Sequence, residues 1–344
     1  MGRFLFRCDI SPQIGAGHLR RCMALAREFK ALGASVIFVL RTRRTIEAKE
    51  LESICDGLTL LDWSLTPEED AQEVVRLCRQ NQIDAAVVDH YHANAEYQQP
   101  LYNSGVRWLQ FDGCIQKQLW ADWVINPSLA SKECDYSSAR QRKETRFLLG
   151  PKYAFLRGEF AQWQPKANFR KEVKKVLLTF GGGDDKGATV FSLDAIKSLD
   201  PSIERVILAS SANASIPDIQ KWMAKNPTIY ATLLIDDTEI ARNMAEADLA
   251  ITAGGMTTFE TAAMGLPTLM IQIAENQRRN ARGWHKEGIA VDLGPINALE
   301  PVFLQRQVKK MMQDEKRREK VSYSAKALVD CLGARRVAQD LLAS

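Results

Sequence analysis

The sequence has no run of about twenty consecutive apolar residues, the length that a membrane-spanning helix needs. Its N-terminus lacks the basic start and apolar stretch that mark a secretory signal. Hydrophobic residues make up 46% and charged residues 26% of the chain, as is typical of a globular protein. We therefore expect no membrane span and a cytoplasmic protein.

Paired cysteines are also missing. The seven cysteines are odd in number and scattered singly, so they form neither a disulfide framework nor the paired spacing of a metal site. His90 and His92 could begin a metal site, but no third ligand is evident. We therefore expect reduced thiols, no metal and no cofactor.

The net charge of +4 is small. Basic residues cluster at 41–44, 140–146 and 309–320, but acidic residues are mixed into the last two clusters and no aromatic platform accompanies them. We interpret the clusters as solvated faces and expect no nucleic-acid partner.

At 344 residues the chain is long enough for two domains, which we predict at 1–150 and 151–344. Short apolar runs alternate with helix-like segments, a pattern that predicts mainly parallel sheets in an α/β fold. The expected strands are 4–9, 35–40, 85–88, 107–111, 123–126, 175–180, 205–208, 232–235, 249–252 and 268–273.

Between the first strand and a helix predicted at 19–30 lies a glycine-rich corner that contains Gly15, Gly17 and His18. Glycines let the backbone approach a ligand closely, and free N–H groups at a helix start attract anions. The same helix end disfavours positive charge on the imidazole, so we expect a neutral His18 that can take a proton. The alternative is that His18 only caps or packs the helix.

Polar residues follow several of the predicted strands, and the carboxyl ends of parallel strands are where ligands collect. They are Asp9, Asp89, Asp112 and Asn126, with Tyr91 close behind Asp89. Helix capping and turn formation are the alternative explanation, because Asp and Asn favour those positions too.

In the second half, Gly182 lies in a glycine loop after strand 175–180, and a further glycine loop follows strand 249–252. Free amides and hydroxyls in that second loop suit a diphosphate, and the carboxylate of Glu260 can accept hydrogen bonds from both hydroxyls of a ribose. Amides at the start of the next helix would serve the same anion. The predicted nucleotide contacts are Gly254, Gly255, Met256, Thr257, Glu260, Asn276 and Gln277. The alternative for Glu260 is a solvated helix carboxylate.

A set of short segments spread over nearly the whole chain forms a recognisable family pattern: 7–9, 14–18, 21–22, 88–91, 150–157, 159–160, 179–182, 253–255, Thr257, Glu260, 265–267 and 276–277. In these segments the chain resembles the UDP-2,4-diacetamido-2,4,6-trideoxy-β-L-altropyranose hydrolase (PseG) family of pseudaminic acid biosynthesis, which is related in fold to the MurG-type GT-B glycosyltransferases.

The resemblance implies a GT-B-like fold, with two Rossmann-type α/β domains facing each other across a cleft. The N-terminal domain would carry the catalytic His and the sugar side, and the C-terminal domain would bind UDP. The implied reaction is metal-free water attack at the anomeric carbon, with inversion and loss of UDP. His18 matches the catalytic base, Glu260 and Asn276 match nucleotide contacts, and Tyr91 matches an aromatic residue that lines the sugar pocket.

The chain departs from the family pattern at 112–114, His92 and Asn94, so the exact sugar stays open. Other expected substrate contacts are Gly15, Gly17, Asp9, Asp89 and Gly182. The sequence does not fix the oligomeric state, although it favours a monomer. Two alternatives to a hydrolase are a GT-B glycosyltransferase, which passes the sugar to an acceptor, and a non-catalytic nucleotide-sugar binding protein.

Overall fold

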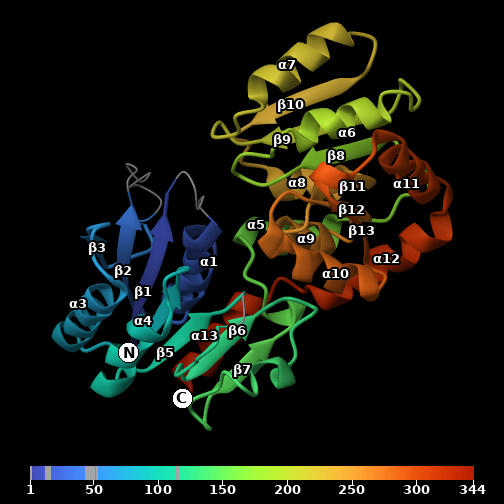
Figure 1. The fold of residues 1–344 in the computed structure, drawn as a ribbon. Coiled ribbons are helices and arrows are strands. Elements are labelled where there is room, and N and C mark those ends of the chain that lie inside the picture. The colour runs from blue at the N-terminus through green and yellow to red at the C-terminus, as the bar shows by residue number, and fades with distance from the viewer. Residues whose placement is uncertain (1, 12–16, 43–50, 52, 114–115) are drawn as a thin grey trace. The chain divides into compact units, whose positions relative to one another are not determined.

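The computed structural model describes residues 2–11, 17–42, 51, 53–113 and 116–344. The chain divides into two compact units (Figure 1). Unit 1 combines Met1–Arg157 with Leu332–Ser344, and unit 2 is Gly158–Cys331. This division differs from the predicted boundaries of 1–150 and 151–344, most of all in the last helix.

That helix, α13 (Gly333–Leu342), belongs to unit 1 because it packs on α1 (Gly17–Ala31). Its apolar face, which includes Val337 and Leu341, joins the same buried cluster as α1. At its first residue a Cβ would lie 2.3 Å from the carbonyl oxygen of Ala154, so glycine alone permits this close approach. The amphipathic sequence of α13 indicates a packing face but not which domain that face meets.

In the described part of unit 1 the sheet has seven strands, and every pairing is parallel. Their order is β3 (Gly57–Leu61), β2 (Ser35–Thr42), β1 (Arg3–Ile10), β4 (Ala85–Asp89), β5 (Trp108–Phe111), β6 (Trp123–Asn126) and β7 (Arg146–Leu149). The central strands are buried on both faces because helices cover both.

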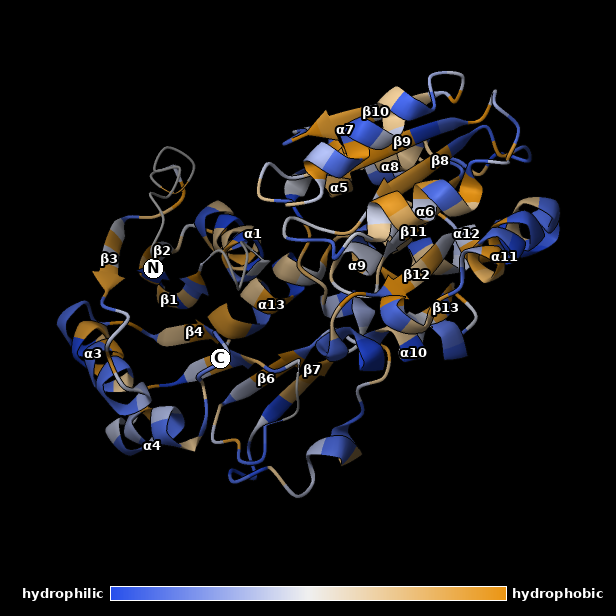
Figure 2. Ribbon diagram, turned by 45° about the horizontal axis from the view of Figure 1, so that its top comes forward, coloured by the Kyte–Doolittle hydropathy of each residue, from blue (hydrophilic) through white to orange (hydrophobic). Residues whose placement is uncertain are grey.

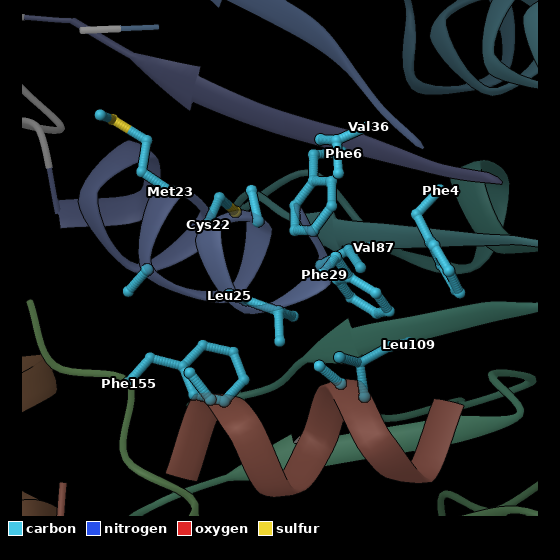
Figure 3. Close-up of a cluster of buried hydrophobic side chains, with 14 of the residues drawn as sticks. Phe4, Phe6, Cys22, Met23, Leu25, Phe29, Val36, Val87, Leu109 and Phe155 are labelled. Atoms are coloured by element: carbon cyan, nitrogen blue, oxygen red, sulfur yellow. The ribbon is translucent and has the colours of Figure 1, made fainter. Parts of the chain in front are cut away.

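Helices α1 and α13 cover one face of this sheet, and α3 (Pro67–Gln80) and α4 (Ala95–Ser104) cover the other. Figure 3 shows the first interface, where Phe6, Phe29 and Val87 pack between α1 and the strands. Side chains alternate between faces along a strand, so neighbouring residues of β1 point into different layers.

In the described part of unit 2 a second parallel sheet has six strands. Their order is β10 (Ala231–Ile235), β9 (Glu204–Ala209), β8 (Lys175–Thr179), β11 (Leu249–Ala253), β12 (Thr268–Gln272) and β13 (Ala290–Pro295). Figure 2 shows mostly hydrophobic residues along β9 and β10 and mostly hydrophilic residues on α10.

The helices of unit 2 include three that pack on one face of its sheet, α6 (Ala188–Ile196), α7 (Ile216–Lys225) and α11 (Pro301–Gln313). The others are α5 (Gly158–Trp163), α8 (Ile240–Glu246), α9 (Thr257–Ala263), α10 (Arg278–Lys286) and α12 (Glu315–Leu328). Within the described residues, no helix has both the length and the apolar character needed to cross a membrane.

Each predicted strand is present, with end shifts of one or two residues. The sequence analysis missed β3, β7 and β13. It also treated Arg318 as part of a solvated cluster, whereas this side chain is buried and donates to the carbonyl of Met311 at 2.9 Å. A basic side chain can enter the interior when its fork finds backbone acceptors.

Both sheets place a change of winding direction at their centre. The chain runs outward from β1 to one edge and from β4 to the other, and β8 and β11 have the same relationship in unit 2. Ligands in open parallel sheets bind beyond the carboxyl ends of the strands at such a switch point. The loops to inspect are therefore those that follow β1, β4, β8 and β11.

Candidate active site

The switch point of unit 1 holds a histidine paired with a carboxylate. His18 is in the first turn of α1, directly after the segment that follows β1, and Asp89 is the last residue of β4. The Nδ1 atom of His18 is 2.8 Å from Oδ1 of Asp89 and 2.9 Å from its carbonyl oxygen. Both of these nearer neighbours are acceptors, whereas the donor Nη2 of Arg21 is farther away, at 3.4 Å, so we assign the hydrogen to Nδ1, which makes Nε2 the acceptor of the neutral ring.

The Asp89 carboxylate stays ionised despite being 1% exposed. Burial alone would raise the pKa of this carboxyl, but the charges and hydrogen bonds of Arg21 and His18 outweigh burial and hold the pKa well below its usual range. Asp89 therefore offers the imidazole an ionised carboxylate as its hydrogen-bond acceptor. Its side chain bonds to protein groups, and its predicted contact with the substrate stays a prediction.

Tyr91 joins this pair from the residues that follow β4. Its ring meets the His18 ring edge-on, with centroids 4.8 Å apart, and the side chain is 51% exposed. The structure thus brings together three of the residues that the sequence predicted at the site: His18, Asp89 and Tyr91. An exposed ring beside an imidazole can contact a bound ligand, and the predicted place of Tyr91 in a sugar pocket stays a prediction.

Asp9 does not join them. Because Cys8 pairs with Asp89 in register, the Asp9 side chain points to the opposite face of the sheet, beneath α3. There it is fully buried and forms an ion pair of 2.6 Å with Arg7, which also pairs with Asp70. The strand-end position suggested a rim residue, whereas the geometry shows a member of a buried ion network.

Three glycines were predicted as substrate contacts, Gly15 and Gly17 in unit 1 and Gly182 after β8, and the structure describes two of them. Gly15 lies outside the described residues. Gly17 begins α1 immediately before His18, and a Cβ there would meet nothing within 4 Å. Gly182 lies exposed in the loop after β8, beside Gly181, whose φ of +92° favours glycine.

In unit 2 the strand β11 runs through Gly254 and Gly255 into α9, as predicted. A Cβ on Gly254 would lie 3.0 Å from the Cβ of Ala281, so the loop packs tightly against α10. Of the predicted contacts, Thr257 is buried at the start of α9, while Met256 and Glu260 are partly exposed.

The two remaining predicted nucleotide contacts lie just before α10, in the short 3-10 turn Glu275–Gln277. Asn276 is exposed there. The Oε1 atom of Gln277 accepts a hydrogen bond of 3.0 Å from the backbone of Ile273. Gln277 thus fixes the end of β12 relative to α10, and its predicted contact with a nucleotide stays a prediction.

Sequence reasoning missed Asn280, which braces the glycine loop. Its Nδ2 atom donates to the carbonyl of Gly254 at 2.9 Å and to the Thr258 hydroxyl at 3.1 Å. The Thr258 hydroxyl in turn donates to the carbonyl of Gly255 at 2.6 Å. These hydrogen bonds hold the carbonyl groups of Gly254 and Gly255 in place, so they fix the conformation of the loop. The spacing of three from Gln277, one helix turn, was the signal that could have found it.

Arg21 was quoted only as part of a motif and was given no role. It lies one helix turn after His18, and its Nε and Nη2 atoms donate to the two carboxylate oxygens of Asp89. This bidentate contact completes a row of three side chains, Arg21, Asp89 and His18.

Comparisons with known proteins define the class. Residues 205–335 match the family model "Glycosyltransferase family 28 C-terminal domain". The structure is similar to MurG of Acinetobacter baumannii, with a TM-score of 0.70 at 15% identity over 99% of this chain and 100% of that one. It also resembles Anabaena Alr3699/HepE in complex with UDP and glucose, with a TM-score of 0.63 at 12% identity over all of both chains. The chain therefore has a GT-B-like fold of two parallel-sheet α/β units, as predicted.

The curated relatives are more specific. The chain is 27% identical over 292 residues to the UDP-2,4-diacetamido-2,4,6-trideoxy-β-L-altropyranose hydrolase of Campylobacter jejuni, covering 84% of this chain and 98% of that protein. It is 24% identical over 336 residues to the spore coat polysaccharide biosynthesis protein SpsG of Bacillus subtilis, covering 94% and 93%. These similarities confirm the predicted resemblance.

A third relative is longer than this chain. An uncharacterized protein of Methanocaldococcus jannaschii is 25% identical over 296 residues, which make up 84% of this chain but 59% of that protein. The chain therefore spans about three fifths of the length of this relative.

Proposed function

We propose that the protein hydrolyses a UDP-linked acetamido-deoxy sugar, releasing UDP and the free sugar with inversion at the anomeric carbon and without a metal. The substrate would be UDP-2,4-diacetamido-2,4,6-trideoxy-β-L-altropyranose or a close relative, in nonulosonic (pseudaminic) acid biosynthesis. The name of the Campylobacter jejuni relative and the GT-B-like fold support an enzyme that acts on nucleotide sugars.

The observation that carries the proposal is the contact of the Nδ1 atom of His18 with Asp89. Because Nδ1 donates its hydrogen bond to Asp89, Nε2 is the atom of the imidazole that can accept a proton. A water molecule hydrogen-bonded to Nε2 can lose a proton to it as the water attacks the sugar. Asp89 then stabilises the imidazolium that forms. The oxygen of water bonds to the anomeric carbon, the bond from that carbon to the diphosphate oxygen breaks with its electron pair, and the water proton moves to His18.

On the nucleotide side, the proposal assigns UDP to unit 2. Backbone amides around Gly255 and Asn276 would stabilise the charge that develops on the departing diphosphate. The carboxylate of Glu260 would accept hydrogen bonds from the ribose hydroxyls. The brace from Asn280 favours this role, because a loop fixed before binding loses little entropy when the ligand arrives.

A second candidate is a GT-B glycosyltransferase that passes the sugar to an acceptor. The match of residues 205–335 to a glycosyltransferase family model favours it. In that case His18 would deprotonate an acceptor hydroxyl instead of water. His18 would act as a base in the hydrolase and in the glycosyltransferase alike. The two candidates therefore differ in the molecule that receives the sugar, which is water in one and an acceptor hydroxyl in the other.

The test is UDP release from a panel of UDP-N-acetylated sugars with no acceptor and with EDTA present. The proposal expects turnover for at least one sugar, which appears first as the inverted anomer in a time-resolved proton NMR spectrum. UDP binding without release would favour the transferase, or the non-catalytic binding protein if added acceptors also gave no turnover. Loss of turnover in EDTA that added metal restores would contradict the metal-free mechanism.

A further inference from the structure

We propose that Arg21 is a positioning residue for His18: it clamps the Asp89 carboxylate and, by neutralising it, keeps the imidazole free to accept a proton. This inference rests on the proposed role of His18 as the base. It assigns to Arg21 a function beyond that of a surface cation on α1.

The geometry holds Arg21 in one place. Both carboxylate oxygens of Asp89 accept from its guanidinium, Oδ2 from Nε and Oδ1 from Nη2. The guanidinium also lies over the ring of Phe111, with 4.6 Å between its carbon and the ring centroid. An aromatic ring and a bidentate carboxylate fix a guanidinium in both position and plane. The Asp89 oxygen that accepts from His18 is therefore fixed as well.

The same contact sets the charge that His18 experiences. A buried carboxylate without a cation would strongly favour a proton on the neighbouring imidazole. Arg21 turns the carboxylate into a neutral pair, and its Nη2 atom lies 3.4 Å from Nδ1 of His18. Burial would lower the pKa of Arg21, but the charge of Asp89, the hydrogen bonds to it and smaller contributions from neighbouring groups together raise the pKa above its ordinary value, so Arg21 stays charged.

Other titratable side chains also lie near the His18–Asp89 pair, on α1, on β1 and in the residues that follow β4. Burial raises the pKa of the Cys22 thiol on α1 well above its usual value. Burial and, next, the charge of Arg7 hold the pKa of His90 well below its usual value. Cys8 on β1 is a buried thiol, and Tyr91 meets His18 through its ring. Among the described residues, Arg21 and Asp89 are the charged groups whose contacts with His18 could control its protonation.

The experiment compares Arg21→Gln, which removes the charge, with Arg21→Lys, which keeps the charge but not the bidentate fork. Arg20→Gln is the matched control, because Arg20 is the exposed neighbour on the same helix. Two quantities are measured for each protein. One is the acidic limb of the pH profile of kcat/KM, and the other is the midpoint of His18 titration in the free protein, followed by NMR of labelled histidine.

In Arg21→Gln the Asp89 carboxylate has no cation beside it, so its negative charge stabilises the protonated imidazole of His18. His18 should therefore become protonated at higher pH than in the wild-type protein. We expect both the acidic limb and the NMR midpoint to move upward by about one pH unit or more. Arg21→Lys should keep both near their wild-type positions while lowering kcat, and Arg20→Gln should change neither. A folded Arg21→Gln protein with an unchanged limb and midpoint would overturn the proposal.

If circular dichroism shows that Arg21→Gln does not fold, the same comparison can be made in proteins that carry Asp89→Asn. The double variant Asp89→Asn/Arg21→Gln buries no unpaired carboxylate. Compared with Asp89→Asn alone, it lacks a cation beside His18, so its NMR midpoint should lie at higher pH. Equal midpoints in these two proteins would contradict an electrostatic role for Arg21.

The two readouts also separate this inference from the proposed function. If the wild-type protein releases no UDP from any sugar, the proposed function fails. The His18 midpoint needs no substrate and still decides whether Arg21 controls the imidazole.

Discussion

The Nδ1 atom of His18 lies 2.8 Å from Oδ1 of Asp89, although 71 positions separate the two residues in the sequence. The contact exists because β1 and β4 are neighbours at the centre of the sheet and α1 starts beside their carboxyl ends. It gives the imidazole a defined tautomer, and the chemical proposals for unit 1 depend on it.

Replacing His18 by Asn should lower kcat by about 10²–10⁴-fold, because the amide cannot take the proton of the attacking water. UDP affinity, measured by isothermal titration calorimetry, should change little, since the proposal places the nucleotide contacts in unit 2. Residual turnover near the wild-type rate would remove His18 from the mechanism.

Replacing Asp89 by Asn should also reduce kcat, by roughly 10²-fold or more, because an amide no longer enforces the Nδ1–H tautomer or stabilises the imidazolium. The matched control is Asp62→Asn, because Asp62 is an exposed carboxylate that accepts a hydrogen bond from the backbone of nearby Ser64. Should Asp89→Asn instead raise KM at constant kcat, Asp89 would be a substrate contact, as the sequence analysis predicted.

Much of the fold could be predicted from the sequence because buried parallel strands are continuous apolar runs followed by polar or glycine-rich turns. β3, β7 and β13 were missed for physical reasons. β3 is only five residues long and begins with a glycine. β7 is four residues long and adjoins a basic cluster, and β13 is interrupted by Asp292, Gly294 and Pro295. The short pattern of each is typical of a loop as much as of a strand.

The site could be predicted only in part. His18 and the loop at Gly254–Gly255 were found because local sequence defines a strand, a glycine turn and a helix start. The pairing of His18 with Asp89 and the separation of Asp9 from both depend on strand order and register. A shift of one residue moves a side chain to the other face, and no local pattern reports register across 80 residues of chain.

Replacing Glu260 by Gln tests the nucleotide side. A hydrogen bond to a charged group contributes about 1.5–3 kcal/mol, so UDP affinity should fall by roughly 10- to 100-fold. Affinity for pyrophosphate, which has no ribose, should not change. Glu319→Gln, an exposed carboxylate on α12, serves as the control. Equal loss of affinity for UDP and pyrophosphate would argue against a ribose contact.

Replacing Gly333 by Ala tests the assignment of α13 to unit 1. The added methyl would collide with the backbone at Ala154, and overpacking of this kind costs about 1–3 kcal/mol. The amides of α13 should then exchange with solvent deuterium faster, by about tenfold or more. Gly158→Ala is the control, since a Cβ there meets nothing within 4 Å. Unchanged exchange in both variants would mean that α13 does not depend on this contact.

The central claim is that water, activated by His18, attacks the anomeric carbon. The most direct measurement is a single turnover of the UDP-sugar in ¹⁸O-labelled water without an acceptor, followed by mass spectrometry of the released UDP. Attack at the anomeric carbon breaks the bond between carbon and oxygen, so the UDP should carry no ¹⁸O and the label should enter the sugar. Label in the β-phosphate of UDP would show attack at phosphorus and contradict the mechanism.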